Sequence, residues 1–262
     1  MSLVNIKRSE NNKIVHLELN LEEKRNILSL KMIQALTENI EKIKKEASIQ
    51  CLILSGAGDH FCAGGDLKWM LVKDDISNTE NINQIKNLSN LFNALNNFHL
   101  PIIGNVQGFS FGGALGLISL CDIALSDTKA QFCFSEIKLA LIPALIAPFV
   151  LKKIPTSKAQ ELMLSGRVFT AQEALNMNLV HFVGDLKERQ IYLDSLTSRL
   201  SHYDKKALQH TKRFLNILPH LKDLEIQDHC IQALAERRKT LEARSKIQKF
   251  LNLKKKKKEK FS

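Results

Sequence analysis

Long apolar runs and targeting signals are both missing from this 262-residue chain. The longest apolar stretch, residues 139–151, is too short to cross a bilayer and contains two prolines. The N-terminal sequence MSLVNIKRSENNK has neither the apolar core of a secretory signal nor the Arg- and Ser-rich pattern of an organelle presequence. We therefore expect a soluble, cytoplasmic protein without a membrane partner.

Cysteine is sparse and lacks the spacing of metal ligands. The five cysteines form an odd set with no C-x-x-C pair and no histidine pair nearby. We expect no metal site, and we interpret each cysteine as a small buried apolar residue in a reducing compartment.

Tryptophan and tyrosine are also scarce, and this affects which partner the net charge of +11 indicates. Residues 254–260, KKKKKEK, hold six lysines and one glutamate, a net charge of +5, which leaves +6 for the rest of the chain. Binding of nucleic acid or of a membrane surface through this tail is one functional hypothesis, but phosphate contacts alone give weak, strongly salt-dependent binding. Proteins that bind single strands stack bases on aromatics, whereas this chain has one Trp and two Tyr. We expect no nucleic-acid partner.

What is present is an alternation of strand and helix patterns in a chain with the composition of a folded globular protein, 44% hydrophobic and 25% charged. Residues 13–19 alternate apolar and polar positions as a half-buried strand does, and residues 51–54 are fully apolar. Between them, apolar residues at helical spacing predict a helix from Ser29. A helix over residues 82–98, a strand over 101–106, an apolar helix after the glycines at 112 and 113, and a strand from 121 follow. This order predicts the α/β class with mainly parallel pairing.

The C-terminal part carries helix patterns almost alone. Amphipathic helices are predicted over residues 191–200, 205–218, 224–235 and 240–251. Their apolar faces need a partner surface, either the α/β core or another subunit. No linker rich in Pro, Gly or Ser is present, so we expect one cooperative unit with a core over residues 1–190 and a helical region with a basic tail over residues 191–262.

Three segments carry the chemistry. FCAGGDLKWM (residues 61–70) and GFSFGGALGL (108–117) are glycine turns after strands, and QFCFSEIKLALIP (131–143) places Glu136 among apolar residues. A glycine turn that opens a helix presents unpaired backbone N–H groups, which favour negative charge. The second turn lacks the Lys and Ser/Thr of a P-loop, and no G-x-G-x-x-G is present. Two such turns beside a shielded carboxylate suggest proton transfer next to a thioester or ketone carbonyl.

These segments resemble the motifs of the crotonase family, the enoyl-CoA hydratase/isomerase superfamily. FCAGGDLKWM is similar to the family's F-x-A-G-x-D-[LI], and PIIGNVQGFSFGGALGLISLCDIAL to its P-x-I-A-x-V-x-G-x-x-x-G-G-G…CDI segment. AQFCFSEIKLALIP and SGRVFTAQEALNMNLVHFV resemble the third and fourth family motifs. All four occur in the family's order and at its spacing, over essentially the whole chain.

The resemblance implies a crotonase-like ββα superhelical spiral that binds an acyl-CoA substrate and forms a homotrimer or a dimer of trimers through its C-terminal helices. CoA is part of the substrate, so no separate cofactor is expected, and its phosphates suit the basic body of the chain. The matched oxyanion donors are the backbone N–H groups of Gly65 and Gly113, and the matched acid–base residue is Glu136. The positions matched to substrate and CoA binding are Arg25, Ala63, Asp66, Leu67, Lys68, Gly112 and Gly116.

The chain departs from the family at the acid–base pair. Family hydratases carry two glutamates, one of them three residues after the oxyanion glycine, and that position is Gly116 here. Glycine transfers no proton, so Glu136 is left as a single acid–base group. Enoyl-CoA delta-isomerases also work with one glutamate at this position, because a 1,3-proton shift needs a single base.

A narrower resemblance favours hydration. FGGALGL with SEIKLALIPALIAPFV resembles bacterial methylglutaconyl-CoA and isohexenylglutaconyl-CoA hydratases of leucine and acyclic-terpene breakdown. Their substrates bear a second carboxylate, for which we hypothesise a role in ordering water or in neutralising Lys68 or Lys138. A methylglutaconyl-CoA-like hydratase is the first hypothesis, an isomerase the alternative, and polyanion binding through the tail the hypothesis from another class.

Overall fold

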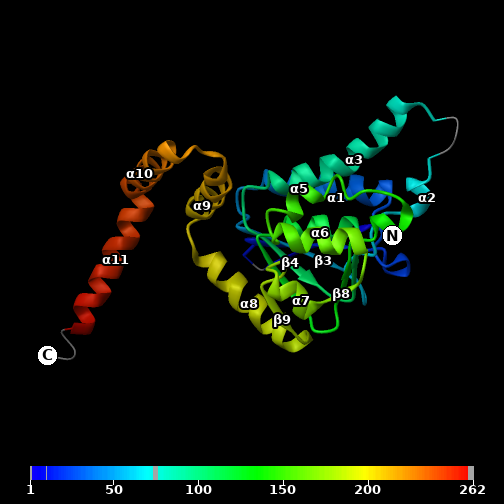
Figure 1. Cartoon of the computed structure of the whole chain (residues 1–262). Coiled ribbons are helices and arrows are strands. Elements are labelled where there is room, and N and C mark those ends of the chain that lie inside the picture. The colour runs from blue at the N-terminus through cyan, green and yellow to red at the C-terminus, as the bar shows by residue number, and fades with distance from the viewer. Residues whose placement is uncertain (1, 10, 73–75, 259–262) are drawn as a thin grey trace. The chain divides into compact units, whose positions relative to one another are not determined.

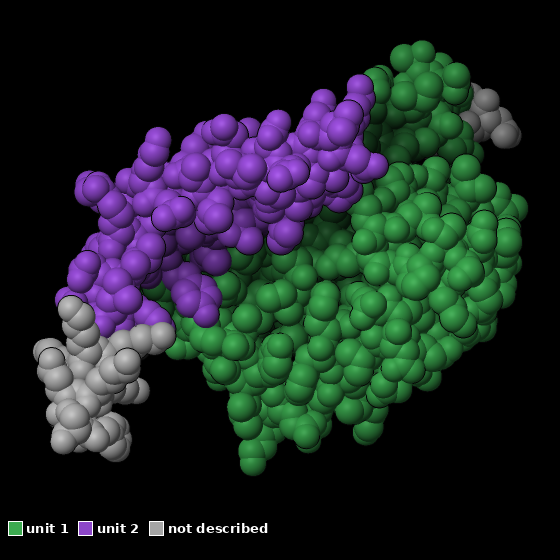
Figure 2. All heavy atoms as spheres, turned by 60° about the vertical axis from the view of Figure 1, so that its left-hand side comes forward, with its two compact units in different colours: residues 1–202 green, residues 203–262 purple. Residues whose placement is uncertain are grey.

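The computed structural model describes residues 2–9, 11–72 and 76–258, with only the backbone described beyond residue 252. The chain forms two compact units, residues 1–202 and residues 203–262, which Figure 2 colours separately. The lysine-rich tail at residues 254–260 lies outside the described side chains. Among the described helices, none combines the length and the apolar composition that a membrane span requires.

A six-stranded sheet forms the centre of the first unit (Figure 1). Strand β1 is antiparallel to β2, and all other neighbours in the order β1-β2-β3-β4-β6-β9 are parallel. The alternation predicted for residues 13–19 places Val15, Leu17 and Leu19 in the core. The α/β class with mainly parallel pairing is confirmed. The strands are β1 (Val4–Arg8), β2 (Ile14–Leu19), β3 (Cys51–Gly56), β4 (Ile102–Val106), β6 (Ile123–Asp127) and β9 (Phe182–Gly184).

A second, smaller sheet positions the candidate site. Strand β5 (Phe109–Phe111) pairs in parallel with β7 (Gln131–Cys133), which pairs antiparallel with β8 (Phe169–Thr170). These strands have only two or three residues each, so the period-two pattern that predicts strands does not develop in them.

The main core lies where α1 (Leu30–Lys44) packs on α3 (Asn78–Asn96) and on strands β1 and β2 of the large sheet. Helix α1 begins at Ser29, whose Oγ accepts a hydrogen bond from Met32 N over 3.3 Å. Its buried residues repeat at helical spacing, as the sequence predicts. The shorter helices are α2 (Leu67–Met70), α4 (Gly113–Ser119), α5 (Ala147–Val150), α6 (Thr156–Ser165) and α7 (Ala171–Asn176).

Helix α8 (Leu186–His202) closes the first unit by contacting β3, β6 and β9. Its buried Arg189 donates hydrogen bonds to Asn105 Oδ1 over 2.7 Å and to Asp127 Oδ2 over 3.2 Å. Leucines farther along the helix, at 193, 196 and 200, are buried as well. These contacts fix α8 to the α/β core, and the boundary predicted between residues 190 and 191 falls inside this helix.

The second unit consists of helices in the predicted order: α9 (Lys205–Ile217), the 3-10 helix η3 (Leu218–His220), α10 (Asp223–Lys239) and α11 (Leu241–Lys258). Asp204 begins α9 by accepting a hydrogen bond from Ala207 N over 2.8 Å, and it also accepts one from Arg237 Nη2 over 2.9 Å. No described residue of α9 or α10 is buried, and Leu224 is 93% exposed. The helices of this unit therefore leave apolar side chains uncovered.

Candidate active site

The three segments singled out from the sequence lie side by side in the first unit. Cys62 and Ser110 form an isolated parallel β-bridge. Phe111 N also donates a hydrogen bond to Cys62 O over 3.1 Å. Gly112 N in turn donates to Cys133 O over 2.9 Å, at the end of β7. Backbone hydrogen bonds thereby join the two glycine turns to each other and to the strand that precedes Glu136.

Two glycines allow this close approach. Gly64 has a φ of +97°, and a β-carbon there would lie 2.7 Å from Phe111 O. Gly112 has a φ of +52°, and a β-carbon there would lie 3.2 Å from Ser135 Oγ and 3.3 Å from Glu136 Oε1. Both positions favour glycine, because other residues adopt such φ values only with strain. At Gly64 the space for a β-carbon is also blocked by Phe111 O.

Gly65 and Gly113 supply the two candidate oxyanion donors. Gly113 is the first residue of α4, where helix geometry leaves the N–H group without a partner inside the helix. Around Gly65, Leu28 N donates to Gly64 O over 2.7 Å and Asp66 N donates to Leu28 O over 3.2 Å. These bonds leave the Gly65 N–H itself without an acceptor among the described residues. Both glycines line the same pocket as Glu136.

Glu136 begins the 3-10 helix η2 (Glu136–Leu139), which follows β7 directly. Its side chain is half-buried, and within the described ranges its Oε2 atom is buried without a hydrogen-bond partner. Burial raises the pKa of the Glu136 carboxyl, and the opposing effect of a hydrogen bond from its own backbone is smaller. A carboxyl with raised proton affinity and one free oxygen suits proton transfer to and from a ligand.

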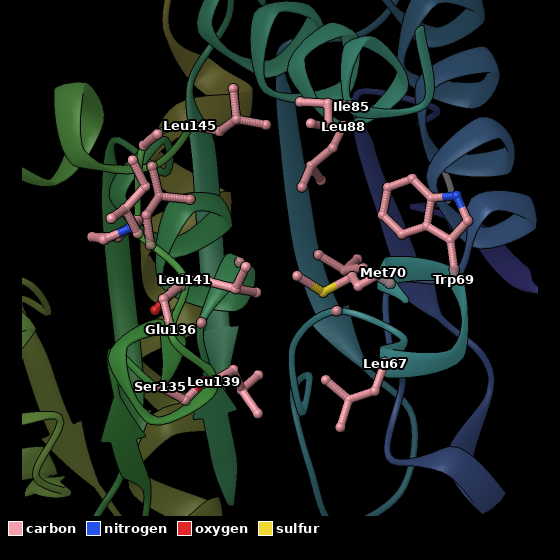
Figure 3. Close-up of a pocket in the computed structure, with 18 of the residues that line it drawn as sticks. Leu67, Trp69, Met70, Ile85, Leu88, Ser135, Glu136, Leu139, Leu141 and Leu145 are labelled. Atoms are coloured by element: carbon pink, nitrogen blue, oxygen red, sulfur yellow. The ribbon is translucent and has the colours of Figure 1, made fainter. Parts of the chain in front are cut away.

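The pocket around Glu136 has a volume of about 690 Å³ and lies between two apolar walls (Figure 3). Glu136, Leu139 and Leu141 stand on one wall, and Leu67 and Met70 face them from the other. Helix α3 completes the pocket with one face, the side chains at 81, 84, 85 and 88. Among the described lining residues, Lys138 is the only cation and Glu136 the only carboxylate. A pocket with this lining suits a long, mostly apolar ligand.

Comparison with known proteins identifies the family. The family profile described as enoyl-CoA hydratase/isomerase matches residues 9–259. The chain belongs to the enoyl-CoA hydratase/isomerase family. It is therefore an enzyme of this family, and an acyl-CoA substrate is consistent with that membership.

Solved and curated proteins agree with this assignment. A crystal structure of an enoyl-CoA hydratase from Shewanella pealeana is 29% identical, with a TM-score of 0.89 over 96% of this chain and 94% of that chain. The 2,3-dehydroadipyl-CoA hydratase of Escherichia coli is 29% identical over 79% of this chain and 80% of its own length. The peroxisomal Delta(3,5)-Delta(2,4)-dienoyl-CoA isomerase of Arabidopsis thaliana is 28% identical over 67% of this chain and 66% of its own length. The chain spans 55% of the length of another curated relative, the enoyl-CoA hydratase AKT6-1 of Alternaria alternata. The predicted crotonase-like fold is confirmed.

In this family member, the pocket contains most but not all of the positions expected from the sequence. Those that line it are Ala63, Gly65, Leu67, Gly112, Gly113 and Glu136. Arg25, Asp66 and Lys68 lie beside it: Arg25 O accepts a hydrogen bond from Ala63 N over 2.9 Å, and Asp66 Oδ1 accepts one from Lys68 N over 3.0 Å at the start of α2. The Arg25 guanidinium lies 5.7 Å from the centre of the Phe109 ring. Their contacts with CoA stay predictions.

Gly116 also lies outside the pocket lining, and it is glycine for a packing reason. A β-carbon at this position would lie 2.5 Å from Ile146 Cγ2 and 3.0 Å from the ring of Phe92. The family's first glutamate is therefore replaced by filled apolar volume and not by an open cavity.

Two residues were not recognised from the sequence: one lines the pocket, and the other is a buried structural residue. The predicted helix over residues 82–98 started too late, whereas α3 begins after its cap Ser77, so the pocket-facing Asn81 was not recognised. The other missed residue is Asn26, which is fully buried and donates to Ala57 O over 2.9 Å and to His60 O over 2.8 Å. Helical spacing predicts the α3 face, but no local pattern points to Asn26.

Proposed function

We propose that this chain hydrates an enoyl-CoA thioester with Glu136 as its single acid–base group. The observation that carries the proposal is one pocket that holds both the Glu136 carboxyl, with its partner-free Oε2 among the described residues, and the glycine turns of Gly65 and Gly113. A thioester oxygen held by the two backbone N–H groups would be stabilised as an enolate, the charge that hydration develops.

In this mechanism one carboxyl carries out both proton transfers. As the water oxygen bonds to C3 of the enoyl group, the Glu136 carboxylate accepts a proton from that water and the C2=C3 electron pair moves toward the thioester oxygen. The Glu136 carboxylic acid then donates the proton to C2 as the enolate collapses, which restores the carboxylate. Burial raises the pKa of Glu136, so the carboxylate is a stronger base than an exposed glutamate.

For the acyl group we propose a second carboxylate, as in methylglutaconyl-CoA. Of the two lysines considered from the sequence, Lys138 lines the pocket and Lys68 does not. Lys138 Nζ lies 3.6 Å from Cys133 Sγ, and sulfur is a weak acceptor that a carboxylate would replace with a stronger, charge-assisted bond. We hypothesise that such a carboxylate also helps to order the attacking water. The name of the Escherichia coli relative, 2,3-dehydroadipyl-CoA hydratase, supports a substrate of this class.

Double-bond migration is the second candidate reaction, because a single base is sufficient for it. The observation that favours it is Gly116, where Phe92 and Ile146 leave no room for a second acid. Glu136 would remove a proton from C2 of a 3-enoyl-CoA and return it to C4. The Arabidopsis thaliana relative named as a dienoyl-CoA isomerase supports this alternative.

We further propose that Arg25, Ala63, Asp66, Leu67 and Lys68 contact the CoA moiety and that the chain assembles as a homotrimer or a dimer of trimers in the cytoplasm. The uncovered apolar side chains of the second unit support the assembly. Sedimentation of the purified protein tests it.

The alternative from another class, polyanion binding through residues 254–260, predicts salt-dependent RNA binding that is lost when those residues are deleted.

A panel of acyl-CoA esters tests the proposed reaction. The panel contains 3-methylglutaconyl-CoA, a 2-enoyl-CoA without a second carboxylate and a 3-enoyl-CoA, with water addition and double-bond migration scored separately. We expect water addition to 3-methylglutaconyl-CoA to be the fastest reaction. Turnover of the 3-enoyl-CoA alone would establish the isomerase instead, and turnover of no ester would overturn both.

A further inference from the structure

Two apolar side chains stand where a second acid–base group would have to act. Gly116 follows Gly113 by one helical turn in α4, so a side chain at position 116 would project on the face that carries the oxyanion donor. That volume is taken by Ile146 and Phe92, whose atoms would lie 2.5 and 3.0 Å from a β-carbon at 116. Their exposed fractions are 3% and 1%.

Both side chains are held in place by their surroundings. Ile146 N donates a hydrogen bond to Pro143 O over 3.2 Å, and Ile146 O accepts one from Val150 N over 3.0 Å, which fixes the backbone at the start of α5. The Phe92 ring packs against Phe149 with their centres 6.0 Å apart. Because the interior is closely packed, neither side chain can turn away without opening a cavity.

Ile146 has a second contact surface, since it also lines the pocket that holds Glu136 and Gly113. The same side chain therefore blocks position 116 and presents an aliphatic surface to the acyl group.

We infer that Ile146, supported by Phe92, is a specificity-determining residue that restricts this site to single-carboxylate chemistry. The inference rests on the proposed enoyl-CoA reaction and deepens it. A substrate that brings its own carboxylate compensates for the missing protein group, whereas a plain 2-enoyl-CoA meets only Glu136 and an apolar wall. The enzyme thereby selects acyl groups that carry a polar group of their own near C3.

The test rebuilds the second acid and makes room for it. Gly116→Glu alone overpacks the core, so we expect a lower melting temperature and no gain in hydration of but-2-enoyl-CoA. Gly116→Glu with Ile146→Ala relieves the overlap, and we expect a partial recovery of the melting temperature. We also expect but-2-enoyl-CoA hydration to rise roughly 10²-fold over either single variant, the lower end of what a positioned acid or base contributes. Leu145 lines the same pocket but is not among the atoms nearest to position 116, so Gly116→Glu with Leu145→Ala is the matched control and should recover neither property.

Each outcome shows whether Ile146 and Phe92 block a side chain at position 116 or leave room for it. Any of three results would overturn the inference. They are a folded double variant without the gain in but-2-enoyl-CoA hydration, an equal gain in the Leu145 control, and a Gly116→Glu variant with the wild-type melting temperature. If the double variant does not fold, Gly116→Ala with and without Ile146→Ala supplies the same comparison of melting temperatures, and a cost that Ile146→Ala does not reduce counts against the inference. Failure of the proposed function is distinguishable, because then the wild type turns over no enoyl-CoA while the melting temperatures still report the packing.

Discussion

The carboxyl of Glu136 lies close to Gly112: a β-carbon at position 112 would lie 3.3 Å from Glu136 Oε1. Gly112 also has φ +52° and ψ −121°, a conformation that other residues adopt only with strain. We predict that Gly112→Ala lowers the free energy of unfolding by about 1–3 kcal/mol and lowers kcat more than it raises KM, because the added methyl displaces the carboxyl. Urea unfolding and steady-state kinetics check this. An unchanged kcat in the folded variant would show that the contact has no bearing on the reaction.

The raised pKa of Glu136 should make the stability of the fold depend on pH. A carboxyl whose pKa is higher in the folded state stabilises the fold below its ordinary value near 4.5, and this contribution is lost as the pH rises through the raised value. Glu136→Gln removes the titrating group. The melting temperature of the variant minus that of the wild type should therefore increase between pH 4 and pH 8, and a series of thermal melts measures it. A difference that is flat with pH, or that falls, would mean that burial does not penalise the charged carboxyl.

The proposed role of Lys138 predicts a change in substrate selectivity. Lys138→Met should lower kcat/KM for 3-methylglutaconyl-CoA by roughly 10–100-fold, the equivalent of one hydrogen bond to a charged group, about 1.5–3 kcal/mol. A 2-enoyl-CoA without a second carboxylate should be nearly unaffected. Lys68→Met is the matched control, since Lys68 lies outside the pocket and should act on both substrates alike. Equal losses on both substrates for Lys138→Met would argue against a carboxylate partner.

Replacing Asn26 should have a purely structural effect, a loss of stability. Its amide is fully buried, accepts from Leu21 N over 2.9 Å and donates to two backbone carbonyls. Asn26→Ala leaves these groups unpaired, and we expect a loss of at least about 1–3 kcal/mol in the free energy of unfolding. Asn20 has one side-chain hydrogen bond, on the surface to Ser2 O, so Asn20→Ala should cost much less. Equal costs for the two variants in urea unfolding would refute the role of the buried amide.

Helices and strands in which apolar residues repeat at a regular spacing were predictable from the sequence, and the short elements were not. Helix α1 shows its buried face as a repeat of apolar residues, and β2 alternates over six residues. Strand β8 has two residues and no period at all, although it belongs to the sheet that carries the site.

The candidate site divides in a similar way. Glu136 and the two glycine turns were recognisable because glycine and an isolated carboxylate are rare in apolar segments. The reason for Gly116 was not recognisable, because it depends on Ile146 and Phe92, which approach it from other parts of the chain. As partners for a second carboxylate, Lys138 and Lys68 were equivalent in the sequence, and only the structure shows that Lys138 lines the pocket and Lys68 does not.

Glu136 alone carries out the proton transfers of the proposed reaction, and the turnover of Glu136→Gln tests this most directly. Glutamine keeps the size of the side chain but carries no transferable proton at the pH of the assay, so we expect kcat to fall by roughly 10²–10⁴. The dissociation constant for the acyl-CoA should stay unchanged, because the glycine turns and the apolar walls remain. Near-wild-type turnover in a variant that still binds the thioester would contradict the single-glutamate mechanism.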